Sequence, residues 1–142
     1  MSDAALAPGG FRPLSRSDWI GFYAMMIGLF MAVLDIQIVA SSLGEISAGL
    51  SATIEETAWI QASYLTAEVI IIPLTAWLAR ALSMRTLFTL SITLFTATSL
   101  LCALAWNIES MIVFRVLQGL SGGTLIPLAF SIIYIIFPPE RR

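Results

Sequence analysis

Four long apolar runs constrain this chain more than any other feature of its sequence. They cover about residues 19–41, 58–78, 86–105 and 111–137. A bilayer core of about 30 Å requires about 20 apolar residues in a helix that rises 1.5 Å per residue. Backbone groups find no water in lipid, so each run must satisfy its own hydrogen bonds as a helix. We therefore expect an all-α membrane protein with four transmembrane helices, and the short connections favour antiparallel neighbours.

The composition supports a membrane protein and excludes several other classes. The chain is 58% hydrophobic and 11% charged, with a mean hydropathy of +0.92. It has no histidine and a single cysteine, Cys102, so a Cys/His metal site, a disulfide within the chain and a histidine-based triad are excluded. No basic patch indicates nucleic-acid binding. We expect no enzyme activity, metal or cofactor, and a lipid bilayer as the surrounding partner.

The charges in the connections indicate an orientation. Six of the seven arginines precede the first run, lie between the second and third, or follow the fourth: Arg12, Arg16, Arg80, Arg85, Arg141 and Arg142. The charged residues of the other two connections are all acidic: Glu45, Glu55, Glu56 and Glu109. By the positive-inside rule, the arginine side faces the cytoplasm. We predict a multi-pass protein of the cell (inner or plasma) membrane with both termini cytoplasmic and residues 1–18 as a tail.

Three charged residues lie inside the apolar runs: Asp35, Glu68 and Arg115. An arginine cannot lose its proton, so a buried one needs a partner. Helix rotation places Asp35 on a face of small residues, where another helix approaches closely. Asp35 and Arg115 also lie within about two turns of the same end of their helices. We expect Asp35 to pair with Arg115, either as a proton-coupling site or as a permanent structural ion pair.

The second run carries a polar stripe, because Gln61, Tyr64, Glu68 and Thr75 share one helix face. Glu68 lies near the membrane midplane. Burial disfavours a charged carboxylate and a nearby arginine favours it, so such an acid can gain or lose a proton as its surroundings change. We expect Glu68, with Gln61, Tyr64 and Gln118, to bind substrate or a proton. The alternative is a permanently protonated Glu68 bonded to Tyr64, Gln61 or a neighbouring helix.

Local signals also mark how the helices begin, pack and bend. Residues 53–56 (T-I-E-E) form a capping-box pattern at the start of the second helix. The third run is rich in Ser and Thr, whose hydroxyls can bond back to the i−4 carbonyl, and is expected to be a packing helix. In the fourth run Gly119, Gly122 and Gly123 allow close helix packing. Pro127 permits a bend there.

Two motifs connect these residues to a known family. Residues 34–40 (L-D-I-Q-I-V-A) are similar to the helix 1 pattern L-D-x-T-I-x-N, and residues 115–123 (R-V-L-Q-G-L-S-G-G) to the helix 4 motif R-x-x-Q-G. Over about residues 34–142 the chain resembles the major facilitator superfamily, and within it the 14-helix drug:proton antiporters of the EmrB/QacA type. One loop departs from the family pattern: Arg80 replaces an acid, and Ala76 and Ser83 replace glycines.

The resemblance implies that residues 19–142 form the first four helices of an N-terminal transporter bundle within a longer protein. It implies proton coupling at Asp35 and Arg115, and export of small amphipathic or cationic drugs in exchange for protons, with a periplasmic adaptor protein as a further partner. Two alternatives stay open. One is a small four-helix multidrug transporter that works as a dimer, and the other is a non-transporting membrane scaffold or assembly module. Continuation of the reading frame beyond Arg142 into further spans would favour the long transporter over both alternatives.

Overall fold

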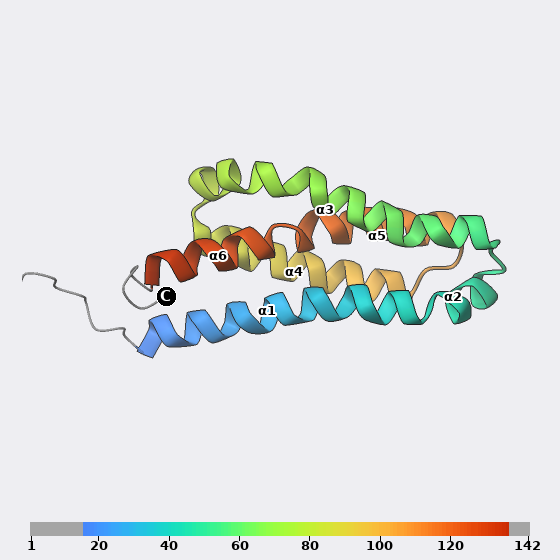
Figure 1. Ribbon diagram of the computed structural model, residues 1–142, viewed down its shortest axis with the longest axis horizontal. Coiled ribbons are helices and arrows are strands. Elements are labelled where there is room, and N and C mark those ends of the chain that lie inside the picture. The colour runs from blue at the N-terminus through green and yellow to red at the C-terminus, as the bar shows by residue number, and fades with distance from the viewer. Residues whose placement is uncertain (1–15, 137–142) are drawn as a thin grey trace, which may run out of the picture.

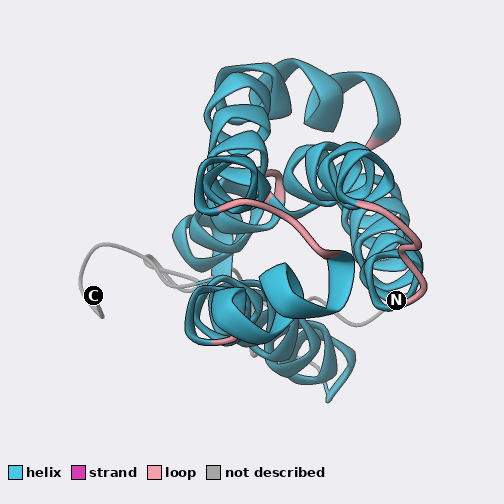
Figure 2. Ribbon diagram, turned by 90° about the vertical axis from the view of Figure 1, so that its right-hand side faces the viewer, coloured by secondary structure: helices cyan, strands magenta, loops and turns pink. Residues whose placement is uncertain are grey.

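The computed structural model describes residues 16–136, which form long helices lying side by side (Figures 1 and 2). Residues 1–15 of the expected tail at residues 1–18, which include Arg12, lie outside the described residues, as do Arg141 and Arg142. The last three residues of that expected tail belong to the first turn of α1. Described residues contain no strand. The helices are α1 (Arg16–Ser41), α2 (Leu43–Leu50), α3 (Ile54–Leu82), α4 (Met84–Ala103), α5 (Ile108–Gly122) and α6 (Leu125–Ile136).

Four stretches of these helices are long and apolar enough to cross a membrane: Trp19–Ser41, Ile54–Leu82, Met84–Ala103 and Ile108–Tyr134. The predicted all-α fold with four membrane-spanning helices is confirmed. The start of α1 and the end of α6 lie at one end of the bundle, and α2 lies at the other (Figure 1). We call the latter the α2 end.

The start of α3 follows the predicted capping box. Thr53 Oγ1 accepts a hydrogen bond from the Glu56 backbone N–H at 3.2 Å, and Glu56 Oε2 accepts from the Thr53 N–H at 2.8 Å. These bonds satisfy two backbone donors that a helix start otherwise leaves free. Because the box fixes the first turn, the helix begins at Ile54, four residues before the apolar run.

The connection after α1 contains a helix that the sequence pattern did not predict. In α2, Ile46 and Leu50 are half-buried and lie one turn apart, so the short helix covers apolar surface with one face. Ser51 ends it in a left-handed conformation with φ of 53°, and its N–H donates to the Ala48 carbonyl. A single apolar turn within a polar segment is too weak a pattern to identify such a helix in advance.

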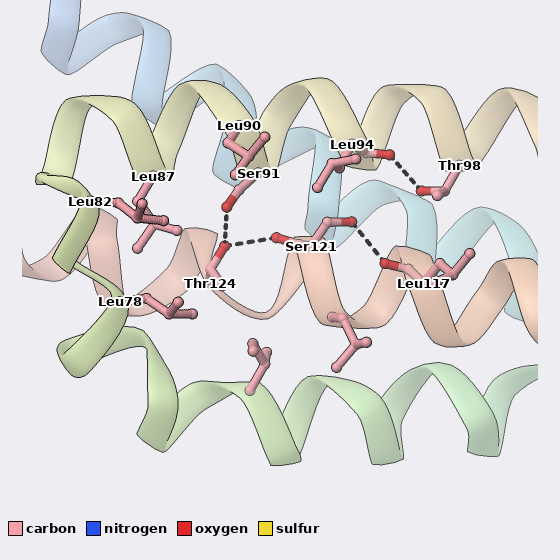
Figure 3. A pocket seen from close by; sticks show the side chains of 12 residues that line it. Leu78, Leu82, Leu87, Leu90, Ser91, Leu94, Thr98, Leu117, Ser121 and Thr124 are labelled. Atoms are coloured by element: carbon pink, nitrogen blue, oxygen red, sulfur yellow. Dashed lines mark hydrogen bonds between the residues drawn. The ribbon is translucent and has the colours of Figure 1, made fainter.

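The fourth span breaks at Gly123 and Thr124, between α5 and α6. The bend was expected at Pro127, and the break lies four residues earlier because the proline ring clashes with the carbonyl of residue i−4. Thr124 Oγ1 donates to the Ser91 hydroxyl of α4 at 2.6 Å and lies 2.8 Å from the Ser121 carbonyl (Figure 3). These contacts attach the broken segment to α4.

Helices α3 and α5 approach closely at two glycines. A Cβ at Gly119 would meet the Tyr64 carbonyl oxygen and would lie 3.0 Å from the Ala67 Cβ. A Cβ at Gly123 would lie 2.6 Å from the Ile71 side chain. These positions therefore exclude any larger residue without a shift of the helices. The close approach brings the polar face of α3 against Arg115.

Candidate buried ion-pair site

Arg115 lies at the centre of the site, two turns into α5, and its side chain is fully buried. The helix starts at the Asn107 cap, whose Oδ1 accepts from the Ser110 N–H at 2.8 Å. Arg115 Nη1 donates to Asp35 Oδ2 at 2.6 Å and to Gln118 Oε1 at 2.8 Å. A membrane-buried cation thus has a counterion on another helix, and this contact is the one that the matching depths predicted.

Asp35 reaches the ion pair from the inward face of α1. That face is buried at Met25, Gly28 and Ala32, whereas Gly21 and Ala24, two small residues nearer the start of α1, are exposed. The second carboxylate oxygen, Asp35 Oδ1, accepts from Gln118 Nε2 at 2.9 Å. Both oxygens are therefore engaged. Only 15% of the Asp35 side chain remains exposed.

Gln118 bridges the pair, because its carbonyl oxygen faces Arg115 and its amide nitrogen faces Asp35. Helix rotation places Gln118 one turn beyond Arg115 on the same face. The two contacts fix the orientation of the amide, since the cation requires an acceptor and the carboxylate requires a donor. A change of charge on either partner would therefore alter the hydrogen bonds of the Gln118 amide.

Helix α3 supplies two further contacts to the guanidinium. Arg115 Nη2 donates to Gln61 Oε1 at 3.4 Å. The Arg115 Cζ lies 4.3 Å from the centroid of the Tyr64 ring, so the cation rests on an aromatic face. Such a contact stabilises a desolvated cation by about 2 kcal/mol. Within residues 16–136 the Tyr64 hydroxyl and Arg115 Nε make no hydrogen bond.

Glu68 lies outside this hydrogen-bonded network. Glu68 is 8% exposed and lies one turn beyond Tyr64 on α3. The structure records no hydrogen bond or ion pair for the Glu68 carboxyl among the described residues. The hydroxyl of Tyr64 lies next to Gly122, and the Gln61 oxygen faces Arg115. The structural alternative included a hydrogen bond from Tyr64 or Gln61 to Glu68, and neither bond is made.

One member of the site was not predicted from the sequence. Cys102 is half-buried and donates from Sγ to Gln118 Oε1 at 3.5 Å. A thiol in an apolar run carries no local signal for such a contact, because the contact depends on the depth of α4 against α5. No group of three acidic, cysteine or histidine residues able to hold a metal occurs in the described part of the chain.

The arrangement supplies one cation of fixed charge and one carboxyl whose charge can change. Breaking a buried ion pair by removing one charge is costly, because the remaining charge is left without a partner. Protonation of Asp35 would therefore alter the hydrogen bonds of Arg115 and Gln118 together.

Comparison with known proteins gives consistent matches. Residues 25–142 match the sequence profile of the Major Facilitator Superfamily. The chain is 49% identical over 128 residues to the Colistin resistance protein EmrB of Acinetobacter baumannii. The alignment covers 90% of this chain and 25% of that protein. It is 40% identical over 124 residues to the Probable multidrug resistance protein EmrY of Escherichia coli, with 87% and 24% covered.

A third relative, Multidrug resistance protein 3 of Bacillus subtilis, is 36% identical over 118 residues, with 83% of this chain and 23% of that protein covered. The chain thus spans about a quarter of the length of the curated relatives it matches. No solved structure matches it.

Proposed function

This chain belongs to the major facilitator superfamily, and from that premise we propose that it works in proton-coupled multidrug efflux, as the first four helices of a transporter's N-terminal bundle. The names of its relatives refer to colistin and multidrug resistance. The observation that carries the proposal is the buried network of Asp35, Arg115 and Gln118 inside membrane-spanning helices. The proposed substrates are small amphipathic or cationic drugs, exchanged for protons.

The coupling step follows from the charges in this network. Arg115 keeps its charge throughout, so Asp35 is the member of the pair that can take up a proton. A protonated Asp35 no longer forms an ion pair with Arg115, and the guanidinium can change partners. The helices that hold the two residues then lose a contact that favours one arrangement over another. Alternating access requires such a change in the relative populations of two arrangements of the helices.

Glu68 has a separate proposed role. It is a buried acid on the same face of α3 as Gln61 and Tyr64, and it stands apart from the Asp35 network. An acid of this kind can pair with a cationic substrate or carry a second proton. Gln61 and Tyr64, which share this face with Glu68, both contact Arg115, so the occupancy of the two sites would be linked through α3.

The proposed orientation places the α2 end outside the cell. Among the described residues, Arg16, Arg80 and Arg85 lie at the opposite end of the bundle, and the exposed acids of the loops lie at the α2 end. The positive-inside rule then assigns the arginine end to the cytoplasm of a cell (inner or plasma) membrane. A periplasmic adaptor protein would contact the α2 end.

The coupling role is tested with Asp35→Asn and Arg115→Gln in the intact transporter. Both variants should insert into the membrane and lose proton-driven drug efflux, measured in everted vesicles by fluorescence of a cationic dye. Glu109→Gln, an exposed acid at the α2 end, is the matched control and should keep efflux. Unchanged efflux in Asp35→Asn and Arg115→Gln would refute the assignment and favour a purely structural ion pair, as in a membrane scaffold.

The role of Glu68 is tested separately with Glu68→Gln. This variant should change the order of preference among cationic and neutral substrates, or the pH dependence of transport, because it removes a charge that can appear in the span. Identical substrate and pH profiles would reduce Glu68 to a structural polar group.

A further inference from the structure

A narrow groove runs between α3 and α4, and α5 closes it from behind (Figure 3). Its volume is about 280 Å³. Apolar side chains form the walls, and buried hydroxyls lie at the base: Ser91, Thr98, Ser121 and Thr124. Helix rotation places Thr124 on the face of α5 opposite Arg115. The groove is therefore separate from the Asp35 network and from the proposed coupling site.

The groove opens on the outer surface of the bundle at the depth of the hydrocarbon core. All three helices that line it belong to membrane-spanning segments. At its mouth Leu90 and Leu94 are 46% and 48% exposed, whereas Leu87 lies buried at the base. On α4 the lining extends from Leu87 to Thr98, which corresponds to about 16 Å of helix. The groove thus follows about half of a hydrocarbon core of about 30 Å.

These dimensions limit what can occupy the groove. Spread over about 16 Å of helix, its volume corresponds to a mean cross-section of about 17 Å². A helix with its side chains is about 10–12 Å across, so no further helix of a longer protein fits inside. A single extended hydrocarbon chain does fit, and such chains surround the protein at this depth.

The chemistry of the base also favours a hydrocarbon. Thr98 and Ser121 donate to carbonyls of their own helices, and Thr124 bonds to Ser91 across α5 and α4. Every hydroxyl at the base thus takes part in a hydrogen bond within the protein. A polar ligand would lose hydrogen bonds on entering such a site, whereas a hydrocarbon needs none.

The charges at one end of the groove match a lipid phosphate. Helices α3 and α4 meet at Ser83, and the groove residues Leu82 and Leu87 lie on either side of this turn. Arg80 and Arg85, both exposed, flank the same turn. Helix rotation points both arginines away from the groove itself, but their long side chains reach the level of the lipid headgroups. A lipid whose chain enters here would carry its phosphate at the depth of two cations.

We propose that the groove binds one acyl chain of a phospholipid whose phosphate lies at the level of Arg80 and Arg85. The chain runs from Leu82, near the turn, toward Thr98. It fills space beside the break between α5 and α6 and so supports the packing of α5 against α3 and α4. The inference goes beyond the proposed function, and only the assignment of this lipid to the cytoplasmic leaflet rests on the proposed orientation.

The test uses the intact transporter in mixed micelles with a phosphatidylglycerol that carries a diazirine on one acyl chain. Light cross-links the chain to its neighbours, which peptide mass spectrometry identifies. A diazirine near the carbonyl should label Leu82 or Leu87, and one at the terminal methyl should label Thr98 or Leu117. Unlabelled dioleoyl phosphatidylglycerol should compete at these positions, because the groove holds a single chain.

Leu94→Trp and Leu100→Trp are matched variants. Both place an indole at an exposed position of α4, but Leu100 lies outside the groove. Leu94→Trp should lower labelling in the groove about fivefold, because a displaced chain loses many dispersion contacts at once. Leu100→Trp should leave it unchanged. Leu120→Trp, at a half-buried position of the lining, replaces Leu94→Trp if circular dichroism shows that the latter is misfolded.

Four results would overturn the proposal. The first is labelling in the groove that dioleoyl phosphatidylglycerol does not compete and that matches the rate at Leu100, which indicates annular lipid only. The second is labelling at Leu100 and none in the groove, which indicates that another part of the transporter covers it. The third is the reverse order along the groove, with the terminal methyl at Leu82 and Leu87. The fourth is an equal loss of labelling in the two tryptophan variants. Efflux is not measured, so these results leave the proposed function untouched.

Discussion

Replacing Gly119 by alanine tests the close approach of α3 and α5 that carries the site. The added methyl group would meet the Tyr64 carbonyl oxygen, which is backbone, and would lie 3.0 Å from the Ala67 Cβ. The matched control is Gly21→Ala on α1, where a Cβ meets nothing within 4 Å. Both substitutions gain the same helix propensity, about 1 kcal/mol. The difference between the variants therefore isolates the steric cost.

That cost follows from what has to move. Overpacking of a well-packed interface costs about 1–3 kcal/mol. We place Gly119→Ala in the upper half of this range, because a backbone carbonyl cannot turn away as a side chain can. Gly21→Ala should raise the free energy of unfolding slightly. Gly119→Ala should have a free energy of unfolding about 2–3 kcal/mol below that of Gly21→Ala.

The measurement is the unfolding equilibrium in mixed micelles, followed by far-ultraviolet circular dichroism as the mole fraction of dodecyl sulfate rises. A second substitution, Ala67→Gly, removes the neighbouring Cβ but leaves the carbonyl in place. It should therefore fail to rescue Gly119→Ala. Equal stability of the two alanine variants, or full rescue by Ala67→Gly, would refute the backbone-contact argument.

Three further predictions use the same unfolding equilibrium. Asp35→Asn should destabilise the fold by about 3–5 kcal/mol, because it leaves the buried Arg115 charge without a counterion, and adding Arg115→Met should recover more than half of this loss. Ser83 has φ 68° and ψ 150°, a region that strongly favours glycine, so Ser83→Gly should stabilise by about 1 kcal/mol even though it removes the hydroxyl that caps α4. Thr124→Val should cost about 1–2 kcal/mol, since it leaves the buried Ser91 hydroxyl without its donor.

Several parts of the fold could be predicted because they depend on local sequence. Four apolar runs of sufficient length required four membrane helices, and the capping pattern at Thr53 and Glu56 marked where α3 starts. The contact between Asp35 and Arg115 was also predictable, because helix rise gives the depth of each residue and a buried cation requires a partner. Depth, helix face and charge together narrowed the candidates to one acid.

The tertiary structure decided which neighbours join that pair. Gln118 bridges both charges, Tyr64 contributes its ring and not its hydroxyl, and Cys102 enters from α4. Glu68 shares a face with Tyr64 yet stays outside the network. Helix rotation predicts faces, but the choice of partner depends on shifts of a few ångströms between helices, which follow from close packing at glycines and from the break at Gly123. The sequence thus determined the charges and their depth in the membrane, and the packing of the helices determined which groups those charges touch.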